Sequence, residues 1–124
     1  MHAPLTLHGA SIEVAPGALE TLGARVSQRA PEHRVVVIAD QAVATLYGQA
    51  ALAAFGSTTP TPILLTFPSG EKHKTRQTWS TLTDQLIAAG CGRDTVIVAL
   101  GGGVTGDLAG FVAATFLRGV PLVQ

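Results

Sequence analysis

The chain has 124 residues and a net charge of zero at pH 7, with 47% apolar and only 13% charged residues. This length predicts one domain with a moderate core. Nothing in the charge balance indicates the basic face that nucleic-acid binding needs, so we expect no nucleic-acid partner. No apolar run of about 18 residues is present, so we expect no transmembrane helix and no membrane partner. The N-terminus lacks a charged segment before a long apolar one, which argues against a signal peptide. Cys91 is the single cysteine, which excludes an internal disulfide and fits a cytoplasmic location; we expect it to be half-buried at a helix exit.

The first third of the chain predicts a short hairpin, a helix and a buried strand. Residues 4–14 alternate weakly between apolar and polar, which indicates a strand or hairpin. Pro16 suits the first turn of a helix that ends at Ala30-Pro31. We expect its buried side to carry Leu19, Leu22 and Val26. His33–Ala39 contains an unbroken apolar run, typical of a parallel strand covered on both faces.

The middle of the chain predicts a second strand and two more helices. Asp40 follows the first buried strand and can cap the next helix. We expect the inner face of that helix to carry Val43, Leu46, Tyr47 and Ala50. A loop over Ser57–Pro60 and a strand over Pro62–Phe67 come next. The polar loop Pro68–Lys74 then leads into a helix that ends near Gly90 or Gly92. We expect this helix to bury Trp79, Leu82, Leu86 and Ile87.

A strand, a glycine turn and a helix follow, and this unit carries the strongest functional signal. Thr95–Leu100 is apolar and rich in β-branched residues, and three consecutive glycines, Gly101–Gly103, come directly after it. The next helix is predicted to bury a stripe of Leu108, Phe111, Val112, Thr115 and Phe116. Such a turn exposes backbone N–H groups at the positive end of a helix and lets a phosphate approach, because no β-carbon is in the way. The turn therefore indicates a phosphate-bearing ligand; the alternative is a tight turn that only packs the helix on its strand.

Gly101, Gly103 and Gly106 satisfy the pattern G-x-G-x-x-G, but an ordinary dehydrogenase-type dinucleotide fold is disfavoured. The turn follows about the fourth strand instead of the first, and the acidic residue expected about 20 residues later would lie beyond Gln124. The turn is not a P-loop either, since no Gly-Lys-Ser/Thr follows. Arg118-Gly119 breaks the last helix, and another strand starts within Val120–Gln124. We therefore expect one domain over residues 1–124 that has been cut from something longer.

Strands and helices alternate throughout, which predicts an α/β fold: a doubly wound, mostly parallel, Rossmann-like sheet with helices on both faces. Ligands of such sheets bind beyond the carboxyl ends of the strands. Three polar loops leave strand ends, namely Asp40-Gln41, Ser69–Lys74 and Gly101–Asp107. We expect them to converge on one edge of the sheet.

The polar side chains of these loops each have a functional and a structural interpretation. Asp40 can accept hydrogen bonds from a ribose hydroxyl pair, or cap its helix, and the two roles are compatible. Lys74 can reach a phosphate or ribose, and Glu71 can orient Lys74 or bind a hydroxyl; the alternative is a solvated helix entrance. Beside a bound phosphate, Asp107 would address a hydroxyl or amide, because like charges repel. Arg118 ends a helix, where a cation is favoured, or grips a phosphate with two hydrogen bonds.

His73 is interpreted as an exposed loop residue. The four histidines are scattered without metal-ligand spacing, so we expect no metal site in this chain. No arrangement of serine, histidine and aspartate can be argued from spacing alone.

Four segments together resemble the N-terminal half of 3-dehydroquinate synthase. They are Phe67–Lys74 (FPSGEKHK), Gly92-Arg93-Asp94, Ala99–Phe111 (ALGGGVTGDLAGF) and Arg118-Gly119-Val120. The resemblance runs in order from about residue 34 to the end, and it is most specific in the second half of the chain.

The resemblance implies an enzyme that uses NAD and a divalent metal, zinc or cobalt. Members convert 3-deoxy-arabino-heptulosonate 7-phosphate to 3-dehydroquinate and phosphate in the shikimate pathway of aromatic amino-acid biosynthesis. It implies NAD contacts at Asp40, on the adenosine ribose, and at Ser69, Gly70, Glu71, Lys72, His73, Lys74, Gly102, Gly103, Val104, Thr105, Gly106 and Asp107. It implies that Arg118 reaches the phosphate of the substrate, a phosphorylated sugar acid, from across the interface of a homodimer.

Other parts of the family pattern are missing from the chain. Its paired threonines, later lysines and asparagine, and the metal-binding glutamate and histidines of its helical second domain are absent. We therefore expect no catalytic residue here, a C-terminal helical domain as partner, and no turnover by this chain alone. The alternatives are a related sugar-phosphate cyclase, a metal-dependent alcohol or glycerol dehydrogenase, and a nucleotide-binding module without chemistry. Gly106-Asp107 and Arg118-Gly119 favour the dehydroquinate type.

Overall fold

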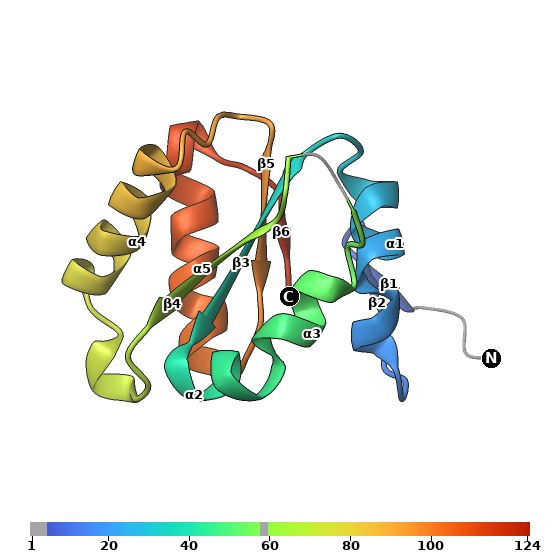
Figure 1. The fold of residues 1–124 in the computed structure, drawn as a ribbon, viewed down its shortest axis with the longest axis horizontal. Helices are drawn as coiled ribbons and strands as arrows, with labels where there is room; N and C mark the ends of the chain where they lie inside the picture. Colours follow the sequence, from blue (N-terminus) through green and yellow to red (C-terminus); the bar gives the residue numbers. More distant parts are fainter. Residues whose placement is uncertain (1–4, 58–59) are drawn as a thin grey trace.

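The computed structural model describes residues 5–57 and 60–124, and its centre is a four-stranded parallel sheet (Figure 1). The strands are β3 (Arg34–Asp40), β4 (Ile63–Phe67), β5 (Thr95–Ala99) and β6 (Leu122–Val123), in the order β4-β3-β5-β6. β3 lies at the centre, with Ile38 opposite Leu65 on one side and Ala99 on the other. The parallel α/β sheet predicted from the alternation of elements is confirmed. In the described ranges, no helix has the length and apolar character that crossing a bilayer requires.

Helices cover both faces of this sheet, and the core therefore has two layers. Alternate strand residues, Val36, Ile38, Ile97 and Ala99, pack under α4 (Arg76–Ala88) and α5 (Gly103–Thr115). Their neighbours, Val35, Val37, Val96 and Val98, pack under α1 (Leu22–Arg29) and α3 (Gln49–Ala53). Because successive strand side chains point to opposite faces, an unbroken apolar run fills both layers at once. Figure 1 shows α4 and α5 on one side of the sheet and α1 and α3 on the other.

The predicted N-terminal hairpin is confirmed. β1 (Leu5–Leu7) pairs antiparallel with β2 (Ala10–Ile12) around His8 and Gly9, which both have positive φ. The first helix starts later than predicted: a 3-10 turn, η1, spans Ala18–Thr21, and Pro16 precedes it. Gly17 has φ 77°, a left-handed conformation that cannot continue a helix back to Pro16. Residues 1–4, at the N-terminus where no signal peptide is expected, lie outside the described ranges. Residues 58–59 of the predicted loop Ser57–Pro60 lie outside them too.

The predicted inner face of the second helix is largely wrong, because part of that helix is a π-helix. α2 (Gln41–Val43) continues into a π-helical turn, η2 (Ala44–Gly48), and then into α3. Leu46 is 71% exposed and Tyr47 51% exposed, and Ala50 is exposed too. The wider turn rotates the following residues around the axis, so Gly48 and Ala51 become the buried positions.

Two large residues predicted to be buried in the last two helices are on the surface. Ile87 of α4 is 63% exposed and Phe111 of α5 is 55% exposed. The expected Phe111 and Thr115 are exposed, and Ala109 and Ala113 are buried in their place. The buried positions of the two helices, with Phe116 directly after α5, are Leu82, Leu86, Thr105, Leu108, Ala109, Val112, Ala113 and Phe116. Small residues let the axis of α5 lie close to the sheet, which is why its buried face is centred on alanines. Trp79 is half-buried, and its ring lies 5.3 Å from that of Phe111.

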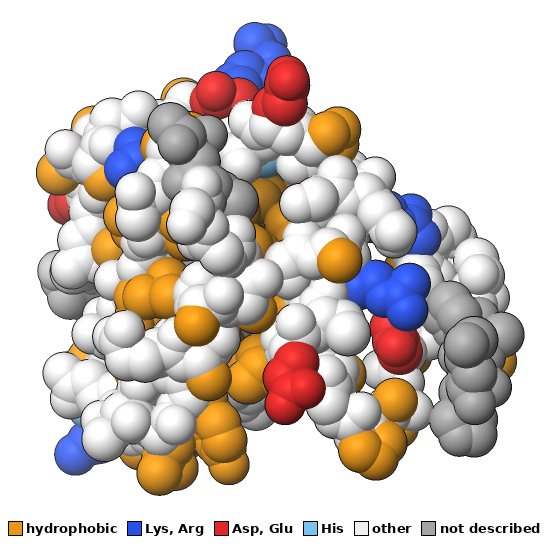
Figure 2. All heavy atoms as spheres, turned by 45° about the vertical axis from the view of Figure 1, so that its right-hand side comes forward, with side chains coloured by type: hydrophobic (Ala, Val, Ile, Leu, Met, Phe, Trp, Pro, Cys, Tyr) orange, Lys and Arg blue, Asp and Glu red, His pale blue; other side chains and the backbone are white. Residues whose placement is uncertain are grey.

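The end of the chain follows the prediction. A 3-10 turn, η4 (Phe116–Arg118), ends α5, and Leu117, Arg118 and Gly119 all have positive φ before β6 begins. On the face in Figure 2, basic side chains lie among acidic ones and no basic patch is visible. Arg25 of α1 forms an ion pair with Glu13 beyond β2, with 2.9 Å between the charged atoms.

Candidate functional site

The sheet order places a switch point between β3 and β5, at the carboxyl ends of two neighbouring strands. β3 is connected to β4 by α2–α3 on one face, whereas β5 is connected to β6 by α5 on the opposite face. The segments that follow β3 and β5 therefore diverge as they leave the sheet. The crevice between them is the usual ligand position in doubly wound sheets. Asp40 ends β3, and Gly101 follows β5 after Leu100, whose N–H donates to the Ile38 carbonyl at 2.9 Å.

The glycine turn at this crevice is bare on its outer side. Gly101 has φ 149°, and a β-carbon built there would lie 2.8 Å from the Thr105 hydroxyl oxygen, so the position requires glycine. A β-carbon on Gly102 or Gly103 would meet nothing within 4 Å, so both open outward. Among the described residues, hydrogen bonding along α5 begins at the Gly106 N–H, which donates to the Gly102 carbonyl at 2.9 Å. The N–H groups before it remain for another acceptor, and together with the helix dipole they fit a phosphate or diphosphate.

Three residues of this turn offer no side chain to the crevice. Thr105 is 1% exposed, and its hydroxyl has no hydrogen-bond partner among the residues described. Val104 is half-buried against the core, and a β-carbon on Gly106 would approach the Gln124 amide nitrogen at 3.3 Å. Any contact of these residues with a ligand is therefore limited to their backbone groups near the surface.

Asp40 and Ser69 lie together, although 29 positions separate them. Asp40 caps α2: its Oδ1 accepts from the Val43 N–H at 2.8 Å. The Ser69 hydroxyl donates to the same Oδ1 at 3.0 Å and accepts from the Ala42 N–H at 3.1 Å. The exits of β3 and β4 are thus joined by side chains.

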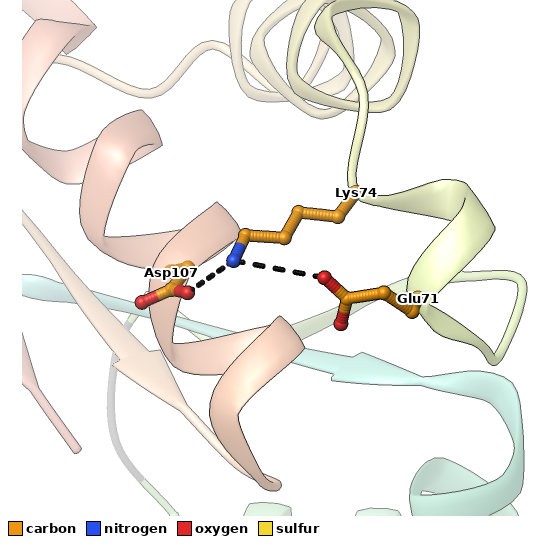
Figure 3. Close-up of polar contacts among 3 residues, drawn as sticks. All are labelled: Glu71, Lys74 and Asp107. Carbon is orange, nitrogen blue, oxygen red and sulfur yellow. Dashed lines mark hydrogen bonds and ion pairs between the residues drawn. The ribbon is translucent and has the colours of Figure 1, made fainter.

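Lys74 joins the loop after β4 to α5, as Figure 3 shows. Its Nζ lies 2.6 Å from Asp107 Oδ2 and 3.9 Å from Glu71 Oε1. The hydrogen bond to Asp107 and the charge of that carboxylate raise the pKa of Lys74 above its ordinary 10.5; Glu71 adds to this and burial opposes it. With the Asp40–Ser69 contact, this ion pair confirms that the three predicted loops converge on one edge of the sheet.

The other predicted site residues of the loop after β4 are Gly70, Lys72 and His73, and they differ in exposure and conformation. Gly70 has φ 114°, a left-handed value that lets the loop turn into η3 (Glu71–His73). Lys72 is exposed, whereas His73 is half-buried, contrary to the prediction of an exposed residue, because the short 3-10 turn folds it inward. Within the described ranges, neither side chain forms a hydrogen bond or ion pair with the other predicted site residues.

Arg118 is not brought to this site. Figure 1 shows α5 running from the edge where α2 begins to the opposite edge, where β6 starts. Its 13 residues span about 20 Å at 1.5 Å per residue. Arg118 therefore lies at the other end of the domain from the glycine turn.

Sequence reasoning missed a surface hollow of about 220 Å³ beside the Lys74–Asp107 pair. It is lined by Lys74, Thr75, Arg76, Trp79, Asp107, Leu108 and Phe111. Trp79 and Phe111 had been assigned to the core because of their spacing, and no sequence signal separates an aromatic wall from a core position. In the part of the chain that the structure describes, no group of three or more histidine, cysteine or acidic side chains could hold a metal ion.

Comparisons with known proteins show related sequences and folds. Residues 64–124 match the family model described as 3-dehydroquinate synthase N-terminal. A 3-dehydroquinate synthase of Pelobacter propionicus is 49% identical over 108 residues, which are 87% of this chain and 30% of that protein. The chain spans about a third of the length of the curated relatives it matches.

Two solved structures share the fold. A 2-deoxy-scyllo-inosose synthase in complex with carbaglucose-6-phosphate, NAD+ and Co2+ aligns with a TM-score of 0.71 and 36% identity, over 82% of this chain and 28% of that one. The 2-epi-5-epi-valiolone synthase ValA of Streptomyces hygroscopicus subsp. jinggangensis 5008, with NAD+ and Zn2+ bound, aligns with a TM-score of 0.74 and 25% identity, over 98% and 33%. From the family match, the relatives and the shared fold, the chain belongs to the 3-dehydroquinate synthase superfamily and corresponds to its N-terminal α/β domain.

Proposed function

We propose that this chain is the NAD-binding domain of a 3-dehydroquinate synthase. The observation that carries the proposal is the outward-open glycine turn at the switch point, where a helix N-terminus presents unused N–H groups. Two structural neighbours were solved with NAD+ bound, which supports this choice of ligand.

In the proposed complex, the diphosphate lies on the turn Gly102-Gly103, where it accepts from backbone N–H groups. Asp40, one strand away, accepts from the adenosine ribose hydroxyls. Lys74, Glu71 and Asp107 form the wall at the other side of the turn and address hydroxyl or amide groups of the nicotinamide half. Once bound, NAD supplies a transient hydride acceptor to the reaction, and the role of this chain is to hold and orient it.

The whole protein would convert 3-deoxy-arabino-heptulosonate 7-phosphate to 3-dehydroquinate and phosphate in the cytoplasm. Its divalent metal, zinc or cobalt, would be held by a C-terminal helical domain. Arg118 lies at the opposite end from the turn, so we propose that it serves the substrate phosphate of a second copy in a homodimer. This chain alone would bind NAD without turning over substrate.

Isothermal titration calorimetry of the 124-residue chain with NAD tests the binding. We expect saturable binding, and competition by ADP, because ADP carries the same diphosphate and ribose. The absence of binding at millimolar NAD contradicts the proposal, and steady phosphate release from the heptulosonate by the chain alone contradicts its dependence on a second domain.

A cyclase for a different sugar phosphate is the second candidate, favoured by the 36% identity to a 2-deoxy-scyllo-inosose synthase. The two candidate functions differ in the substrate and not in the proposed nucleotide site. Phosphate release by the full-length protein from the heptulosonate 7-phosphate or from a hexose 6-phosphate decides between them.

A further inference from the structure

The hydrogen bonds of Ser69 suggest a role other than the expected nucleotide contact. Its hydroxyl proton is donated to Asp40 Oδ1, and its oxygen already accepts from the Ala42 N–H. A hydroxyl has one proton to donate, so Ser69 has no donor left for a ligand. Its side chain is committed to the start of the neighbouring helix.

Asp40, by contrast, has one oxygen that is unpaired among the described residues. Both described donors, the Val43 N–H and the Ser69 hydroxyl, go to Oδ1. No donor among the described residues is paired with Oδ2. A carboxylate has two lone pairs on each oxygen, so Oδ2 can accept from two hydroxyls of a diol.

We propose that Ser69 is a positioning residue, which fixes the Asp40 carboxylate so that Oδ2 is presented to the ribose diol of the nucleotide. The inference rests on the proposed NAD binding. Without Ser69, the capping bond from Val43 can be made by either carboxylate oxygen, and the carboxylate can turn about its last bond. With Ser69, Oδ1 has two donors, one from α2 and one from the loop after β4, and Oδ2 has none among the described residues, so the two oxygens are no longer equivalent.

The fixed carboxylate also sets which nucleotide is accepted. A ribose 2′-hydroxyl donates to Oδ2, whereas the 2′-phosphate of NADP is repelled by the negative charge. Loosening Asp40 should therefore weaken NAD binding more than NADP binding. A purely structural role of Ser69 would weaken both equally.

The test is a double-mutant cycle measured by calorimetry with NAD and NADP. Ser69→Ala should weaken NAD binding about five-fold, in line with the loss of one hydrogen bond, and should lower the NAD/NADP preference by a similar factor. Ser69→Thr keeps the hydroxyl and should restore both. Asp40→Ser keeps an N-cap oxygen but removes the carboxylate, and in that background Ser69→Ala should have no effect.

Thr83→Ala is the matched control, since it removes a hydroxyl that donates to the Trp79 carbonyl at 2.9 Å on α4, away from the site. It should leave both affinities unchanged. Two results would overturn the inference while NAD binding by the parent chain stands. One is that Ser69→Ala lowers the affinities for NAD and NADP by the same factor. The other is that Ser69→Ala lowers NAD affinity as much in the Asp40→Ser background as in the parent chain. If the parent chain does not bind NAD, the proposed function fails first, and the role of Ser69 falls with it.

Discussion

Gly101 and Gly102 are neighbours in one turn, yet alanine should have a different effect at each. At Gly101 it should lower the stability of the fold, and at Gly102 it should lower the affinity for NAD. Gly101→Ala places a side chain at φ 149°, and its β-carbon would lie 2.8 Å from Thr105 Oγ1 and 3.1 Å from Thr105 Cβ. The conformational strain costs about 1–3 kcal/mol, and the overpacking costs about 1–2 kcal/mol more. A total of about 2–5 kcal/mol is a large part of the stability of a domain of this size, about 5–15 kcal/mol.

Gly102→Ala should leave the fold intact. Gly102 has φ −90° and ψ −155°, which any residue adopts, and its β-carbon would meet nothing within 4 Å. Gly102 is the N-cap of α5, where alanine is less favourable than glycine, so we expect a loss of about 1 kcal/mol or less in the free energy of unfolding. The new methyl group would, however, stand in the space proposed for the diphosphate, so NAD affinity should fall at least ten-fold.

Urea unfolding followed by circular dichroism gives the stabilities, and calorimetry gives the affinities. Thr105→Ala in the Gly101→Ala background should recover about 1 kcal/mol, because it removes the closest atom but not the strain. Equal stability losses at the two glycines would refute the reasoning, and so would an unchanged NAD affinity in Gly102→Ala.

Three further outcomes are expected. Thr105→Val replaces a buried hydroxyl that has no hydrogen-bond partner among the described residues, and should raise the free energy of unfolding by about 1 kcal/mol. A lower free energy of unfolding, measured with urea, would contradict this and show that the hydroxyl has a partner. The raised pKa of Lys74 means that its ion pair with Asp107 stabilises the fold fully below pH 10.5 and loses this effect as the pH rises through the raised value. The difference in melting temperature between the parent and Lys74→Met should therefore persist from neutral pH up to pH 10.5 and shrink above it, and a difference that disappears by pH 9 contradicts this. Gly23→Ala would drive a β-carbon into the carbonyl oxygen of Ala54 and should cost more than about 3 kcal/mol, whereas Ser27→Ala on the exposed side of the same helix should be neutral by thermal unfolding.

The strands, and the edge of the sheet that carries the site, were predictable from the sequence for a physical reason. Runs such as Val35–Ile38 and Val96–Val98 are apolar on every residue, and only a strand covered on both faces accommodates that. Once the strands are parallel, all their carboxyl ends face one edge, so the loops after them must meet. The strand order, by contrast, does not follow from alternation, because it depends on which face each connection crosses.

Side-chain orientation was less predictable. Leu46 and Tyr47 were expected inside because their spacing assumes 3.6 residues per turn, and the π-helical turn changes that phase. Phe111 was expected inside because it falls in the apolar stripe of its helix, but Ala109 and Ala113 occupy the face that packs on the sheet. The Asp40–Ser69 and Lys74–Asp107 contacts join residues 29 and 33 positions apart, and no local pattern encodes such pairs.

The Trp79 indole offers a built-in optical probe of this domain. It is the single tryptophan of the chain, its Nε1–H donates to Thr115 Oγ1 at 3.0 Å, and its ring borders the same hollow as Lys74 and Asp107. Its emission is therefore sensitive to any rearrangement of these charged neighbours, without a label and without interference from a second indole. Nucleotide titrations and stopped-flow traces can follow this one fluorophore, and Phe111→Leu would identify how much of the signal passes through the adjacent ring.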